Sequence, residues 1–137
     1  MRINGVIMPG LNEWLAVAGG GAIGATARYG AFLWAERALP RGLPWGTLLV
    51  NVAGSLLIGI AFVLLVERGF LSPAWRQFFT VGLLGAFTTF SAFSLDAVML
   101  FNAGEAVRAF AYVLTSVMVC ILAAMLAIFL TRSLLAL

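Results

Sequence analysis

Four long apolar stretches occupy most of this chain and decide what it can fold into. They lie at about residues 13–34, 45–66, 74–101 and 105–130, and each is long enough to cross a bilayer as a helix. Water is absent from the bilayer core, so backbone amides there must bond within helices or within a closed barrel. Long apolar runs without strict alternation favour helices. The sequence therefore predicts an all-α membrane protein, a single domain of four transmembrane helices spanning residues 1–137.

The residue types that carry most enzyme chemistry are missing. The chain has no histidine, and its one cysteine, Cys120, cannot form an intrachain disulfide. Charged residues are only 9% of the chain, and no two acidic residues lie close together within an apolar stretch. Metal hydrolysis, acid–base pairs and nucleophile triads therefore lack their parts. The eight arginines are scattered singly, so we expect neither an enzyme nor a nucleic-acid-binding protein.

Glycines in the first stretch predict close helix packing. Gly19, Gly21 and Gly24 fit the spacing of a dinucleotide-binding loop, but no strand precedes them, so this function is not expected. Gly20 and Gly24 are four residues apart, which lets two helix backbones approach closely in a membrane.

The arginines are shared almost evenly between the two faces that four spans would create. The face with both termini would hold four, and the opposite face three: Arg2, Arg68, Arg76 and Arg132 against Arg37, Arg41 and Arg108. The Lys/Arg bias of short loops sets orientation, and a difference of one is close to no bias. We expect insertion in both orientations and pairing of two chains about an axis in the membrane plane. A fixed topology is the alternative.

Polar side chains form rows on two of the predicted helices. Thr47, Asn51 and Ser55 are four residues apart, and so share one face of the second helix. On the fourth helix the same spacing repeats at Tyr112, Ser116 and Cys120. Such groups can hold an ion, but they can also merely bond neighbouring helices together, at about 0.6 kcal/mol per bond.

The third stretch is unusual in its middle. Between Gly85 and Ser94 it has glycine, threonines and serines, which are weak helix formers, and the sequence predicts a break there. Carbonyl groups freed by such a break are natural ligands for a small cation. Phe90 and Phe93 are three residues apart beside the break, and their ring edges carry partial positive charge that suits an anion. Ordinary aromatic packing is the alternative.

Three segments together resemble one known family. These are Gly24-Ala25-Thr26-Ala27-Arg28, Trp45 through Asn51 with Gly54, and Gly82 through Ser94. The chain resembles, over nearly its whole length, the Fluc family of fluoride channels, also called CrcB proteins. The resemblance implies an antiparallel, dual-topology homodimer with two fluoride pores in the bacterial inner membrane.

The resemblance also implies roles for particular residues. Asn51 would lie at the pore mouth, Phe90 and Phe93 would be the pore phenylalanines, and Arg28 would attract anions into a vestibule. A polar track for fluoride would include Thr47, Tyr112, Ser116 and Cys120. A structural Na⁺ at the dimer centre would be bound by the backbone carbonyls of Gly85 and Thr88. At Cys120 the family commonly has serine, and a thiol is a weaker donor than a hydroxyl.

The function expected from these residues is passive, selective conduction that exports fluoride from the cytoplasm. Successive weak donors can replace the water of a small anion and still release it. The alternative is a proton-coupled small multidrug exporter, which needs a carboxylate in mid-membrane. Glu13 lies at the start of the first stretch and Asp96 lies after the break, so neither has the position that such an exporter requires in its first helix. A protein with a purely structural role would leave the joint occurrence of break, polar rows and phenyl pair unexplained.

Overall fold

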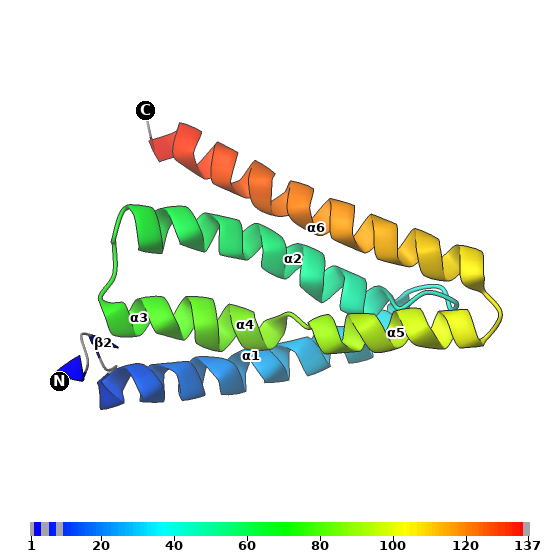
Figure 1. The fold of residues 1–137 in the computed structure, drawn as a ribbon, viewed down its shortest axis with the longest axis horizontal. Helices are drawn as coiled ribbons and strands as arrows, with labels where there is room; N and C mark the ends of the chain where they lie inside the picture. The colour runs from blue at the N-terminus through cyan, green and yellow to red at the C-terminus, as the bar shows by residue number, and fades with distance from the viewer. Residues whose placement is uncertain (1, 4–5, 8–9, 136–137) are drawn as a thin grey trace.

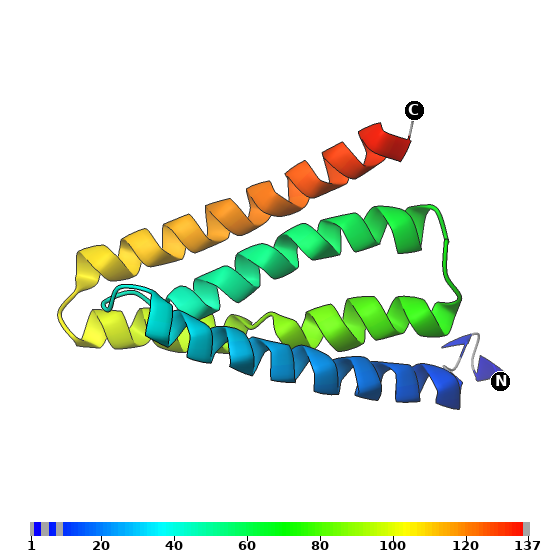
Figure 2. The ribbon, with the colours of Figure 1, turned by 180° about the vertical axis from the view of Figure 1, so that it is seen from behind.

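A computed structural model describes residues 2–3, 6–7 and 10–135 of the 137-residue chain. Long helical segments run side by side along the long axis of the molecule (Figures 1 and 2). Near the amino terminus two short strands, β1 and β2, pair antiparallel, with Arg2 opposite Ile7. The elements in chain order are β1 (Arg2–Ile3), β2 (Val6–Ile7), α1 (Leu11–Ala38), α2 (Trp45–Ala61), η1 (Phe62–Glu67), α3 (Pro73–Gln77), η2 (Phe78–Leu84), α4 (Gly85–Phe87), α5 (Phe90–Asn102) and α6 (Ala106–Leu135).

The first helix is longer than the sequence indicated. It continues four residues past 34, so that Arg37 lies in its last turn, and it ends before Pro40, which cannot continue a helix. Exposed charges are compatible with a last turn that lies outside lipid. Gly10 is the capping residue at the start of α1, without a side-chain bond, and Asn12, of a residue type that often caps helices, lies inside the first turn.

The second and third helical segments both contain π-helical turns. α2 passes directly into η1, and α3 passes into η2 and then α4. Ser72 is the capping residue of α3, without a side-chain bond, and Pro73 occupies its first position. The predicted break is also present, and Thr88 and Thr89 separate α4 from α5.

The last helix begins at Ala106 and extends five residues beyond 130. Asn102 and Glu105 have the spacing of a capping box, but they do not form one. Asn102 is the last residue of α5, and the Glu105 carboxylate instead pairs with Arg108 at 2.9 Å. Gly104 makes the turn between the helices with φ of 79°, a conformation that side chains disfavour.

Three helical segments are long and apolar enough, by length and composition, to cross a membrane. Many large apolar side chains on them are exposed, as a lipid-facing surface requires. α1, the least apolar of the four predicted spans, is not among the three. The segments are Trp45–Glu67, Pro73–Asn102 and Ala106–Leu135.

Backbone-to-backbone contacts of glycine hold α1 against η2. Gly20 and Gly24 are buried, and a Cβ on Gly20 would lie 2.9 Å from the Leu83 nitrogen. From the other side, a Cβ on Gly82 would lie 2.7 Å from the Val17 carbonyl oxygen. The predicted close approach at Gly20 and Gly24 is therefore confirmed. It places α1 directly beneath the segment that leads to the break.

Candidate functional site

The break between α4 and α5 lies near the middle of the third helical segment. Thr88 is the sixteenth residue of the 30-residue segment Pro73–Asn102, and Thr88 and Thr89 both have extended backbone angles. The Thr89 hydroxyl accepts a hydrogen bond of 3.2 Å from the Ala92 amide and so caps the start of α5. In a continuous helix that amide would bond to the Thr88 carbonyl. The cap therefore frees a carbonyl at membrane depth.

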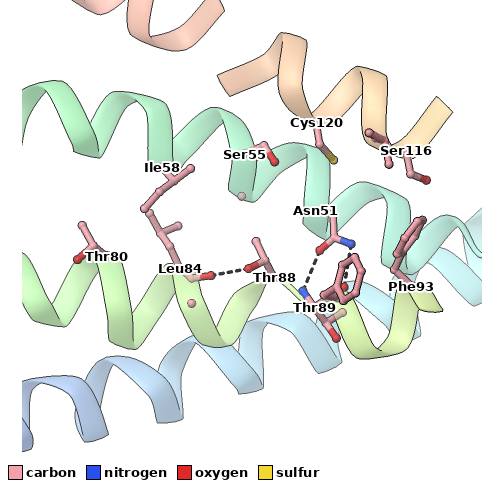
Figure 3. A pocket seen from close by; sticks show the side chains of 14 residues that line it. Asn51, Ser55, Ile58, Thr80, Leu84, Thr88, Thr89, Phe93, Ser116 and Cys120 are labelled. Atoms are coloured by element: carbon pink, nitrogen blue, oxygen red, sulfur yellow. Dashed lines mark hydrogen bonds between the residues drawn. The ribbon is translucent and has the colours of Figure 1, made fainter. Parts of the chain in front are cut away.

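Side chains from two other helices hold the freed backbone groups. Arg28 on α1 donates from Nη1 to the Thr88 carbonyl at 3.2 Å. Asn51 on α2 accepts the Thr89 amide at 2.8 Å and donates from Nδ2 to the Thr89 carbonyl at 3.0 Å (Figure 3). Unbonded amides and carbonyls are costly in a bilayer, so the break is stable only with such partners. The pairing leaves the Gly85 carbonyl without the Thr89 amide that it would meet in a continuous helix.

A cavity of about 390 Å³ lies between α2, the break and α6. The two predicted polar rows meet here, with Asn51 and Ser55 from α2 and Ser116 and Cys120 from α6 (Figure 3). None of the described lining residues carries a charge. They are Asn51, Gly54, Ser55, Ile58, Thr80, Leu84, Gly85, Thr88, Thr89, Phe90, Phe93, Ser116, Val117 and Cys120.

Ser116 has a free hydroxyl within this wall. The residue is only 4% exposed, and its Oγ has no hydrogen-bond partner in the part of the chain that the structure describes. Buried hydroxyls are normally bonded, so an isolated one indicates a position for a ligand or water. Asn51 also keeps donor capacity, because its amide has two N–H bonds and Thr89 takes one.

The two phenylalanines differ in their surroundings. Their ring centroids are 5.6 Å apart, but Phe93 is 9% exposed whereas Phe90 is 79% exposed. The Phe93 ring also lies 5.4 Å from the ring of Tyr112. Phe93 therefore connects the cavity to the next polar group on α6, and Phe90 extends to the outside of the chain.

Thr47 and Tyr112 lie beyond the cavity, around the carboxylate of Asp96, which is not among the predicted site residues. Thr47 is only 4% exposed, and its hydroxyl donates to Asp96 Oδ2 at 2.6 Å. The Tyr112 hydroxyl lies 3.4 Å from the same Asp96 oxygen. Asp96 and Thr47 also line a second hollow of about 620 Å³ at the loop before α2. Asp96 follows Phe90 and Phe93 at the same spacing of three, which is the signal that was overlooked. An ionisable residue within a span is a candidate functional group.

Arg28 does not line either of these hollows, and its described polar contact is the Thr88 carbonyl. Within one chain Arg28 therefore lies at the break, and its place in a vestibule stays a prediction. Among the described residues no group of three or more His, Cys, Asp or Glu side chains is arranged to hold a metal ion.

The family model described as CrcB-like protein, Camphor Resistance (CrcB), matches residues 15–128. The chain belongs to this family. Similar curated relatives include the fluoride-specific ion channel FluC of Saccharophagus degradans, 46% identical over 122 residues that cover 88% of this chain and 90% of the relative. The protein of the same name from Rhizobium meliloti is 44% identical over 107 residues, covering 78% and 86%. That of Rhizobium etli is 50% identical over 101 residues, covering 74% and 81%.

Membership in the CrcB-like family, together with several apolar helices, makes the chain a multi-pass bacterial membrane protein. The family consists of channels and not of enzymes, and the proton-coupled exporter is not favoured.

Proposed function

We propose that this chain is a passive fluoride-selective channel that exports fluoride from the cytoplasm. The observation that supports this most is the uncharged cavity beside the broken helix, where Asn51 and Ser116 keep free donors. The relatives that cover most of the chain carry the name fluoride-specific ion channel.

Fluoride is small and strongly hydrated, so a pathway must supply donors close together while its width excludes larger halides. The Ser116 hydroxyl, the second N–H of Asn51 and the positive edge of the Phe93 ring offer three weak sites in one cavity. No cationic side chain lines that cavity among the described residues, so nothing there binds the ion too tightly to leave.

Beyond Phe93 the ion would meet the hydroxyls of Tyr112 and Thr47. Both are engaged with Asp96 in the structure, at 3.4 and 2.6 Å. Fluoride would therefore compete with the Asp96 carboxylate for these two protons. Like charges repel in a medium of low dielectric constant, so fluoride would bind only weakly at this end of the path, next to Asp96. Cys120, at the opposite end of the row, contributes only a weak donor.

The functional unit in this proposal is an antiparallel homodimer of dual topology, with α1 as the fourth transmembrane helix and two pores. Phe90 is 79% exposed, and Gly85 and Ser91 beside the break are also exposed. Exposed polar backbone at membrane depth is unfavourable against lipid and favourable against protein. A second copy, related by a two-fold axis, would cover this face, in agreement with the nearly even arginine count.

A structural Na⁺ at the centre of that dimer fits the residues that are present. The Gly85 carbonyl has lost its helical amide, and the Thr88 carbonyl keeps one lone pair beside its bond to Arg28. Unwound backbone carbonyls are suitable ligands for such an ion. Bound there, Na⁺ would neutralise the carbonyl dipoles of both broken helices and so stabilise the dimer interface.

Fluoride efflux from proteoliposomes, followed with a fluoride electrode, tests the function. We expect fluoride efflux without chloride efflux, and strong loss of it in Phe90→Ile and Asn51→Ala. Phe129→Ile is the matched control, because Phe129 is 66% exposed on α6 and lines no part of the cavity. Equal chloride and fluoride flux, or no fluoride flux from folded protein, refutes the proposal.

Topology and sodium need separate measurements. Single cysteines introduced into the loops of a cysteine-free variant should be modified from both sides of the membrane if both orientations occur. Modification from one side alone would contradict dual topology. Removal of Na⁺ should shift the protein from dimer to monomer in detergent, and an unchanged dimer would contradict the cation site.

A further inference from the structure

Cys120 is the only cysteine of the chain, and it lies in the wall of the cavity beside the break. Its side chain is partly exposed, on the same face of α6 as Ser116 and opposite α2 (Figure 3). A thiol-reactive compound that enters the cavity therefore has a single target.

Ser116 supplies independent evidence that this part of the cavity holds a ligand or a water molecule. Its hydroxyl is buried and has no partner among the described residues, although such groups are normally bonded. Ser116 and Cys120 are one helical turn apart, about 6 Å along the axis at 1.5 Å per residue. A group attached to the sulfur of Cys120 would reach the space that a ligand of Ser116 uses.

We propose that Cys120 is a modification site, at which a small thiol-reactive electrophile closes the ion pathway from inside the cavity. The proposal rests on the fluoride conduction proposed above. With methyl methanethiosulfonate, the Cys120 sulfur attacks the sulfenyl sulfur, and a new S–S bond forms while the S–SO₂ bond breaks. Methanesulfinate leaves with the electron pair and the thiol proton goes to water. The thiol is oxidised and the thiosulfonate is reduced, so no other reactant is needed.

The consequence follows from the chemistry of the cavity wall. The methylthio group is apolar, has no donor, and would lie beside the free hydroxyl of Ser116. An ion at that hydroxyl would lose contact with water and with neighbouring donors, and the loss of one hydrogen bond to a charged group corresponds to about tenfold in occupancy or more.

Intact mass and fluoride efflux, measured on the same proteoliposomes, test the proposal. We expect the mass of one added methylthio group, a fall in fluoride efflux of about tenfold, and recovery with dithiothreitol. Cys120→Ser, compared with its own untreated efflux, should gain no mass and lose no flux. A Cys120→Ser/Leu122→Cys variant is the matched control, because Leu122 is 56% exposed two residues further along α6 and lines no part of the cavity. Its modification should leave efflux unchanged.

Fluoride should also slow the modification of Cys120 more than chloride does, because an ion at Ser116 excludes the reagent. Folded protein that gains no mass, or that gains it with no change in efflux, overturns the modification site. If untreated protein shows no fluoride efflux, the proposed function fails, and equal modification rates in fluoride and chloride would then overturn the site as well.

Discussion

Asn51 has two roles in this structure, and one pair of substitutions separates them. The side chain holds the break by accepting the Thr89 amide at 2.8 Å and by donating to the Thr89 carbonyl at 3.0 Å. Its remaining N–H is the donor proposed for fluoride. Asn51→Ala removes all of these groups. Asn51→Asp keeps an acceptor for the Thr89 amide and removes both donors.

The magnitude follows from the group that is left unbonded. In Asn51→Ala the Thr89 amide loses its partner, which costs about 1–3 kcal/mol for a buried donor. That energy corresponds to roughly 5- to 150-fold faster hydrogen exchange at Thr89, since every 1.4 kcal/mol is tenfold. Asn51→Asp should keep the slow exchange of Thr89 and still lose fluoride efflux.

Hydrogen exchange by mass spectrometry on peptides across residues 84–93, together with electrode-measured efflux, is the assay. Ser55→Ala is the control for exchange, because Ser55 lines the same cavity one turn away and, unlike Asn51, makes no side-chain hydrogen bond to Thr89. Equal exchange in Asn51→Ala and wild type would refute the role in holding the break. Normal efflux in Asn51→Asp would refute the donor role and leave the structural one intact.

Three further predictions follow from the packing and the charges. Gly24→Ala should destabilise the protein by about 1–3 kcal/mol, because its Cβ would overlap a backbone carbonyl of η2. Gly21→Ala, with no described atom within 4 Å of its Cβ, should unfold at the same denaturant concentration as wild type. Cys120→Ser should raise fluoride efflux, since a hydroxyl is a stronger donor than a thiol. An unchanged efflux rate would show that the side chain at position 120 does not contact the ion. Glu67→Gln, which breaks an exposed pair with Arg132, should change neither efflux nor the thermal unfolding temperature.

The features of the fold that depend on local chemistry could be predicted from sequence. The start of α3 was recognisable from Ser72 and Pro73, and the break from the run of threonines and serines after Gly85. The ends of α1 and α6 were not recognisable. Hydropathy marks where lipid begins, whereas a helix continues into water until a residue such as Pro40 stops it.

Residues on one helix could be placed in the site from sequence, but contacts between helices could not. The four-residue spacing located the row Tyr112, Ser116 and Cys120, which the structure places along one face of α6. Nothing in the spacing indicated that Arg28 would contact Thr88 across 60 residues, or that Asp96 would occupy two of the proposed pathway hydroxyls. Such pairs are set by the helix packing, which periodicity within one helix does not specify.

The break also explains why residues of different helices must act together. A broken helix in lipid leaves backbone groups without partners, and here Arg28 from α1 and Asn51 from α2 supply them. Arg28 reaches Thr88 only because the glycines of α1 let it lie against η2 with backbones in contact. A larger residue at Gly24 would therefore move the guanidinium away from the break as well as loosening the packing. We infer that substitutions at Gly24 and Arg28 should speed exchange in the same peptide across residues 84–93, and that combining them should add little to either alone.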